Sequence, residues 1–217
     1  KKQPVTVLMT DLRGFSTLAS ELPADDVVRM LNHYLGAMTD VILEHGGTID
    51  EFIGDAILVI FNAPLEQPDH ALRALRCGVA MQQAMGAANA WTRANGLPAL
   101  EMGIGVHTGP AVVGNIGSEK RQKYGVVGTT VNLAARVESL TVGGQLLATA
   151  AAVDAAGPAV QSIEWKTVHP KGAREPLTVR RVDGVDGQVL LAGTPDLAPL
   201  PPRPVQWSAV HGKERVP

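Results

Sequence analysis

The chain is poor in the features that mark several common protein classes. Its single cysteine, Cys77, excludes an internal disulfide framework and a zinc site built on cysteines. Its longest unbroken apolar run, Ala56 to Phe61, is far too short to span a bilayer. A net charge of −2 provides no broad cationic surface for nucleic acid. The first residues do not resemble a signal peptide, so we expect a cytoplasmic domain without membrane insertion.

The composition is nevertheless that of a folded protein. Apolar residues make up 45% of the 217 positions and charged residues 18%, which suffices for a core. Six of the 15 prolines follow Gly193, in a stretch typical of an extended linker. We therefore predict one domain at residues 1–190 and a proline-rich tail or linker at residues 191–217.

Hydrophobic patterns predict strands and helices in the order β-α-β-β-α-β, with weaker elements behind them. The clearest signals are a strand at Val5–Leu12, a helix from Pro23 to Gly46 and a hairpin with arms Thr48–Ile53 and Ala56–Phe61. A second hairpin is expected to turn at Thr108-Gly109-Pro110. This order predicts an α+β fold, a ferredoxin-like βαββαβ core with a C-terminal extension.

Two aspartates fall at positions that this topology would bring together. Asp11 ends the first strand and Asp55 begins the third, which inserts antiparallel between the first and second. Taken singly, Asp11 could be a helix cap and Asp55 a turn residue. Together their carboxylates would repel unless a cation lies between them, and oxygen ligands suit Mg²⁺, Mn²⁺ or Ca²⁺.

Two further segments suggest phosphate chemistry. A strand-to-helix turn follows the first strand and consists of Arg13, Gly14, Phe15, Ser16 and Thr17. Its N–H groups could hold phosphate oxygens, although many such turns look alike. In a later helix, Asn132 and Arg136 stand four residues apart and so share one face. Either could equally be a surface residue, but beside a cation site they indicate a bound triphosphate.

These motifs together resemble the catalytic domain of class III nucleotidyl cyclases of the bacterial type, over about residues 4–185. The matching segments run Met9 to Ser16, Phe52 to Asp55, Gly105 to Gly109 and Val127 to Arg136. The resemblance implies that Asp11, Asp55 and the Leu12 carbonyl hold two divalent cations, Mg²⁺ or Mn²⁺, with Ca²⁺ as a non-productive occupant. These would activate the ribose 3′-hydroxyl and neutralise the triphosphate, with release of pyrophosphate.

The same resemblance assigns the remaining roles. Asn132 would orient the ribose, Arg136 would stabilise charge on the α-phosphoryl group, and Lys171 would contact the triphosphate. It also implies a homodimer whose active sites lie at the interface, with the aspartates from one subunit and the other groups from its partner. The polar segment from Asn115 to Lys123 is either a dimer-contacting arm or a solvated loop.

The positions that recognise the base favour guanine. Adenylyl cyclases of this family usually carry a lysine where this chain has Glu51, and Asp or Thr where it has Gly125, next to Tyr124. A carboxylate accepts from the N1–H and N2 amine of guanine, whereas the N1 acceptor of adenine requires a donor. We expect Glu51, Tyr124 and Gly125 to contact the base, and GTP to be preferred to ATP.

Three other functions remain to be weighed. The nearest is an adenylyl cyclase, since few substitutions separate the two specificities. A catalytically inactive dimerisation module is disfavoured because Asp11, Asp55, Asn132 and Arg136 are all present. A diguanylate cyclase or polymerase palm shares the two-aspartate layout, but the hairpin from Phe52 to Asp55 lacks the Gly-Gly-Asp/Glu-Glu-Phe sequence.

Overall fold

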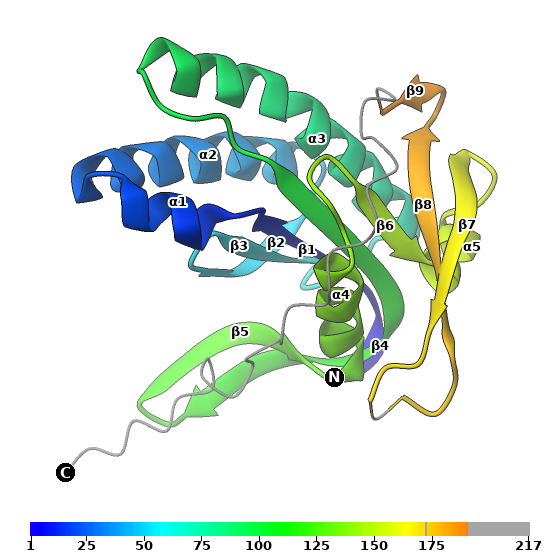
Figure 1. Ribbon diagram of the computed structural model, residues 1–217. Helices are drawn as coiled ribbons and strands as arrows, with labels where there is room; N and C mark the ends of the chain where they lie inside the picture. Colours follow the sequence, from blue (N-terminus) through cyan, green and yellow to red (C-terminus); the bar gives the residue numbers. More distant parts are fainter. Residues whose placement is uncertain (172, 191–217) are drawn as a thin grey trace.

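A single mixed sheet organises the protein in the computed structural model, which describes residues 1–171 and 173–190 (Figure 1). The predicted tail at residues 191–217 lies outside the described residues. Neighbouring strands follow the order β2-β3-β1-β4-β6-β8-β7, while β5 pairs with β4 and β9 with β8. The strands are β1 (Lys2–Leu12), β2 (Thr48–Ile53), β3 (Ala56–Phe61), β4 (Met102–Ser118), β5 (Arg121–Val127), β6 (Leu146–Thr149), β7 (Val160–Val168), β8 (Leu177–Val185) and β9 (Gln188–Val189).

The first four strands confirm the ferredoxin-like core. Strand β3 lies between β2 and β1 and is antiparallel to both. Strand β4 pairs antiparallel with the other edge of β1. The register of β1 and β3 places Thr10 opposite Ile57, so the end of β1 meets the start of β3, as the sequence predicts.

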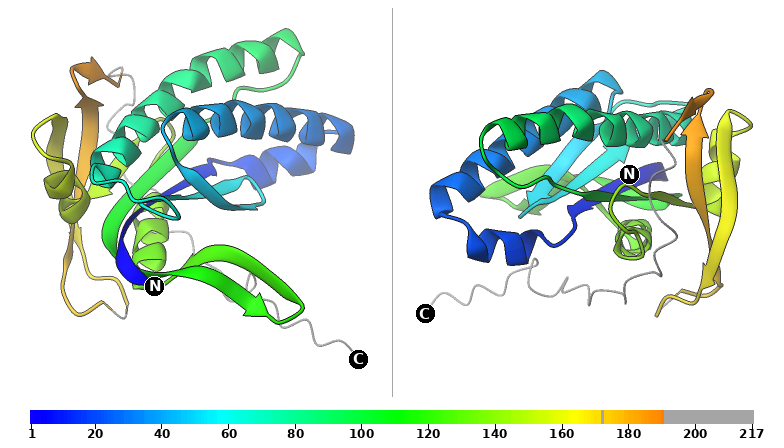
Figure 2. Two further views of the ribbon diagram at one scale, coloured as in Figure 1. Left: turned by 180° about the vertical axis from the view of Figure 1, so that it is seen from behind. Right: turned by 45° about the horizontal axis from the view of Figure 1, so that its top comes forward.

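Alternating side chains divide the core between the two faces of the sheet. On one face, Leu8 of β1 and Val59 of β3 pack beneath α2 (Ala24–Glu44) and α3 (His70–Ala94). On the other face, Val7 of β1 and Leu58 of β3 pack against α4 (Thr129–Ser139). Figure 2 shows α2 and α3 together on one side of the sheet and α4 on the opposite side. The α4 face therefore has less helical cover.

Strand β4 corrects the prediction of a hairpin at Thr108-Gly109-Pro110. These residues lie within one continuous strand and pair with Thr6, Val5 and Pro4 of β1. A Cβ at Gly109 would lie 2.8 Å from Oγ1 of Thr130, so this glycine allows α4 to approach the strand. The chain turns only after Ser118, where β4 and β5 form a projecting hairpin, the arm, from residues 112–118 and 121–127 (Figure 1).

Two short helices complete the chain between these elements. Helix α1 (Phe15–Glu21) follows β1, and α5 (Ala150–Ala156) follows β6. Strand β6 runs parallel to β4, and β8 and β7 extend the sheet beyond it, which forms the expected C-terminal extension. Among the described residues, no helix combines the length and apolar character needed to cross a membrane.

Candidate functional site

Asp11 lies at the end of β1, and Asp55 lies in the turn just before β3. Oδ2 of Asp55 accepts a 2.9 Å hydrogen bond from the backbone N–H of Leu12. This bond fixes the turn at Gly54, whose φ of 62° suits glycine, against the end of β1. The pair of aspartates was predicted from topology, and the structure brings them to one edge of the sheet, which we call the carboxylate edge.

A buried tyrosine beneath this edge reports the local charge. Tyr34 of α2 is fully buried, and its hydroxyl donates to Sδ of Met102 at 3.1 Å. Burial raises the pKa of Tyr34, and the negative charges of Asp55 and Asp11 raise it further. Asp55 and Asp11 therefore both lie near enough to Tyr34 for their charges to act on its hydroxyl.

The donor set at the carboxylate edge fits a hard divalent cation. Two close carboxylates favour a bound cation, and Mg²⁺ is commonly held by one or two carboxylates with water and substrate phosphates as its other ligands. The described residues contain no group of three or more His, Cys, Asp and Glu side chains that could hold a metal ion. A site here would consist of Asp11, Asp55 and the Leu12 carbonyl, completed by substrate oxygens.

The turn after Asp11 presents backbone groups rather than side chains. Gly14 has a φ of 68° and precedes the first turn of α1. The N–H groups in the first turn of a helix have no partner within the helix, so those of Phe15, Ser16 and Thr17 are candidates for phosphate oxygens. The Phe15 side chain is buried, whereas Ser16 and Thr17 are exposed.

The side chain of Arg13 packs against α4. The guanidinium is almost fully buried and forms an ion pair with the Glu138 carboxylate of α4. Its Nη2 also donates to the Glu138 carbonyl at 3.0 Å and to Oγ1 of Thr141 at 2.8 Å. Arg13 thus supports the turn from behind by linking it to the end of α4.

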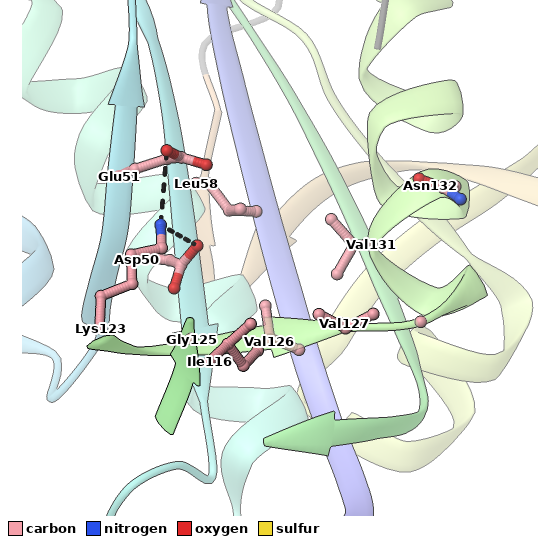
Figure 3. A pocket seen from close by; sticks show the side chains of 11 residues that line it. Asp50, Glu51, Leu58, Ile116, Lys123, Gly125, Val126, Val127, Val131 and Asn132 are labelled. Carbon is pink, nitrogen blue, oxygen red and sulfur yellow. Dashed lines mark hydrogen bonds and ion pairs between the residues drawn. The ribbon is translucent and has the colours of Figure 1, made fainter. Parts of the chain in front are cut away.

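Two of the three predicted base-contacting residues, Glu51 and Gly125, line a separate cavity of about 430 Å³ between β2, the arm and the start of α4 (Figure 3). Asn132 lines it as well, and no residue of the carboxylate edge does. The wall is otherwise largely apolar. The complete lining is Asp50, Glu51, Leu58, Ile116, Lys123, Gly125, Val126, Val127, Gly128, Val131 and Asn132.

Two charged lining residues, Asp50 and Lys123, were not predicted. The Lys123 ammonium lies 3.4 Å from Oδ2 of Asp50 and 3.4 Å from Oε2 of Glu51 (Figure 3). Burial raises the pKa of Asp50, although Lys123 opposes that shift. Strict alternation along β2 would place Asp50 and Glu51 on opposite faces, so the sequence pattern gives no reason to expect both in one cavity.

Helix α4 carries the remaining catalytic candidates. Oγ1 of Thr130 donates to the Pro110 carbonyl at 2.7 Å and ties the first turn of α4 to β4. Asn132 is exposed at the cavity, and Arg136 follows one turn later, half-buried. The shared helix face predicted for these two residues is consistent with their place in α4.

Two of the predicted site residues, Tyr124 and Lys171, lie neither at the carboxylate edge nor in the lining of the cavity. Tyr124 alternates with Lys123 and Gly125 along β5 and does not line the cavity. Lys171 is exposed between β7 and β8, at the end of the strand order opposite to β2 and β3. A contact of Lys171 with the triphosphate stays a prediction.

Comparison with known proteins gives a consistent result. A family model described as the adenylate and guanylate cyclase catalytic domain matches residues 1–177. Adenylate cyclase 1 of Rhizobium meliloti (strain 1021) is 36% identical over 186 residues, which are 85% of this chain and 28% of that protein. The chain thus spans less than a third of the length of this curated relative.

Solved structures agree with the fold over most of the chain. The guanylyl cyclase Cya2 superposes with a TM-score of 0.85 and 51% identity, covering 88% of this chain and 98% of that one. The adenylyl cyclase CyaB from P. aeruginosa superposes with a TM-score of 0.83 and 32% identity, covering 87% and 98%. Relatives of both base specificities therefore share this architecture.

Proposed function

Because the chain belongs to the adenylate and guanylate cyclase catalytic domain family, we propose that it converts GTP to 3′,5′-cyclic GMP and pyrophosphate. In this reaction the ribose 3′-oxygen forms a bond to the α-phosphorus, and the bond from that phosphorus to the pyrophosphate oxygen breaks. A nucleoside triphosphate is an abundant cytoplasmic metabolite, so we place the domain in the cytoplasm.

Different residues of the chain have separate roles in this reaction. Asp11, Asp55 and the Leu12 carbonyl would hold divalent cations, Mg²⁺ or Mn²⁺, which when bound supply positive charge to the triphosphate and acidify the 3′-hydroxyl. Asn132 orients the ribose. Arg136 donates to the α-phosphoryl oxygens as charge develops on them.

The preference for GTP over ATP is proposed from the residues that line the cavity. Glu51 presents a carboxylate to the edge of guanine that carries the N1–H and N2 amine donors, and Gly125 adds no side-chain acceptor that would repel O6. ATP is the second candidate because Lys123 also brings an ammonium donor to the cavity, and adenine N1 accepts hydrogen bonds.

The separation of the carboxylate edge from the cavity supports a homodimer. Each chain carries both halves of a site at different places, so two chains related by a two-fold axis would build two complete sites. Exposed apolar side chains of β2, the arm and the cavity rim provide surface for such an interface; they are Phe52, Val112, Ile116, Tyr124 and Val127.

The test is a cyclase assay with GTP and ATP in parallel, in Mn²⁺ and in Mg²⁺, over a range of protein concentrations. We expect cyclic GMP as the main product and a specific activity that rises with protein concentration. A strong preference for ATP would overturn the assignment of the base. The absence of either product at all concentrations would overturn the cyclase function of this chain.

A further inference from the structure

Strand β2 contains an irregularity at the point where it enters the cavity. The register with β3 pairs Ile49 with Val59 and then Glu51 with Leu58, so Asp50 is an extra residue, a β-bulge. A bulge interrupts the alternation of side chains along a strand. Asp50 and Glu51 can therefore face the same cavity, and Lys123 contacts both of them.

The Asp50 carboxylate is buried and incompletely partnered. Its side chain is only 4% exposed. Oδ2 accepts from Lys123, while Oδ1 has no hydrogen-bond partner among the described residues. A buried carboxylate oxygen without a donor is unfavourable, so a ligand that brings an N–H to this atom gains a full hydrogen bond.

Gly125 leaves the space that the Asp50 carboxylate uses. A Cβ at position 125 would lie 2.9 Å from Oδ1 of Asp50, which is too close for an undisturbed contact. A carboxylate oxygen of Asp50 from β2 therefore occupies part of the space that a side chain at position 125 would fill.

The two carboxylates match the donors on one edge of guanine. Lys123 contacts one oxygen of each carboxylate, which leaves Oδ1 of Asp50 and the other oxygen of Glu51 for the base. Guanine has two adjacent donors, N1–H and the N2 amine, whereas adenine has only the N6 amine there. We propose that Asp50 is a second purine-contacting residue, which accepts from the 2-amino group while Glu51 accepts from N1–H. This assignment rests on the GTP cyclase function proposed above.

The test compares GTP with inosine triphosphate, which keeps N1–H and O6 but lacks the 2-amino group. We expect the parent protein to prefer GTP in kcat/KM by about tenfold or more, the value of one hydrogen bond to a charged group. Asp50→Ala should lower kcat/KM for GTP and bring the ratio of the two substrates close to one. The lowered ratio should also appear in the Ki values with which GTP and inosine triphosphate each inhibit turnover of the other. A purely structural role of Asp50 would not change the ratio of these Ki values.

Glu51→Gln is the matched control, because both nucleotides carry N1–H. It should lower kcat/KM for both substrates and preserve their ratio. Should Asp50→Ala fail to fold, Asp50→Leu, which keeps the branched shape without an acceptor, gives the same measurement. A parental ratio that survives either Asp50 variant overturns the role of Asp50 alone. A parent that cyclises only ATP overturns the GTP assignment and the 2-amino contact together.

Discussion

At the scale of single residues, the proposed function gives the Asp55 carboxylate a chemical role beside its structural one. Its Oδ2 holds the end of β1 through the N–H of Leu12 at 2.9 Å, and its charge contributes to the carboxylate edge. These two roles can be separated because an asparagine side chain also accepts a hydrogen bond but carries no charge.

We expect Asp55→Asn to abolish cyclase activity while the free energy of unfolding stays near that of the parent. Asp55→Ala removes the hydrogen bond as well, so it should also lose about 0.5–1.5 kcal/mol of stability. Activity in Mn²⁺ and urea denaturation measure the two effects. An active Asp55→Asn protein would show that this carboxylate does not hold the cation.

The sequence predicts site residues best where topology alone determines their place. Asp11 and Asp55 follow from strand order, whereas Glu51, Gly125 and Asn132 follow from the resemblance to the cyclase family. The place of Arg13 could not be predicted, because whether an arginine turns outward to a ligand or inward to Glu138 depends on packing. Asp50 was missed because a β-bulge leaves no pattern in the hydrophobic residues.

At the scale of secondary structure elements, the bulge in β2 places a charge where it weakens the fold. Burial raises the pKa of Asp50 despite the nearby Lys123, so the ionised carboxylate is less favourable in the folded than in the unfolded protein. A carboxyl whose pKa is raised on folding stabilises the protein below its ordinary pKa, and that stability is lost as the pH rises through the folded value.

Asp50→Asn should therefore raise the melting temperature at neutral pH. Its advantage over the parent should shrink as the pH falls, and it should vanish near pH 4, about the ordinary pKa of an aspartate. Thermal unfolding across this range measures the difference. A variant that is less stable than the parent at neutral pH would show that the ion pair with Lys123 outweighs the cost of burial.

Strand β4 and helix α4 pack with almost no space between them. A Cβ at Gly105 would collide with the backbone of Glu138, so α4 would have to move away from the sheet. We expect Gly105→Ala to destabilise the protein by about 1–3 kcal/mol, as overpacking does. Gly36, in the middle of α2 with nothing near its Cβ position, is the control. Gly36→Ala should stabilise by about 0.5–1 kcal/mol in the same urea titration.

The course of β4 shows what local sequence can and cannot decide. Thr108-Gly109-Pro110 has the composition of a turn, yet it lies in a strand, because Gly109 gives space to Thr130 of α4. That neighbour lies 21 positions later in the chain. The hairpin of β2 and β3, in contrast, turns at Gly54-Asp55 as predicted, since its turn needs only the positive φ of Gly54.

At the scale of the whole molecule, the proposed dimer predicts that two inactive variants regain activity when they are mixed. Asp55→Asn removes one half of a site and Arg136→Ala the other, the latter lowering kcat by about 10²–10³. Each mixed dimer would contain one intact site and one doubly altered site. Random mixing of equal amounts should recover about a quarter of parental activity, because half of the dimers are mixed. Activity no greater than the sum of the two separate proteins would contradict sites shared between chains.

The buried ion pair of Arg13 with Glu138 has a consequence for how such a dimer closes on its substrate. It fastens the turn beside the carboxylate edge to the helix that carries Asn132 and Arg136 within the same chain. Separating a buried pair is costly, so we expect these two parts to move together. In the proposed dimer, the approach of the catalytic groups to the nucleotide would then come from a rotation of one subunit against the other. Because both sites would lie at the one interface, closing the first would then also change the opening of the second.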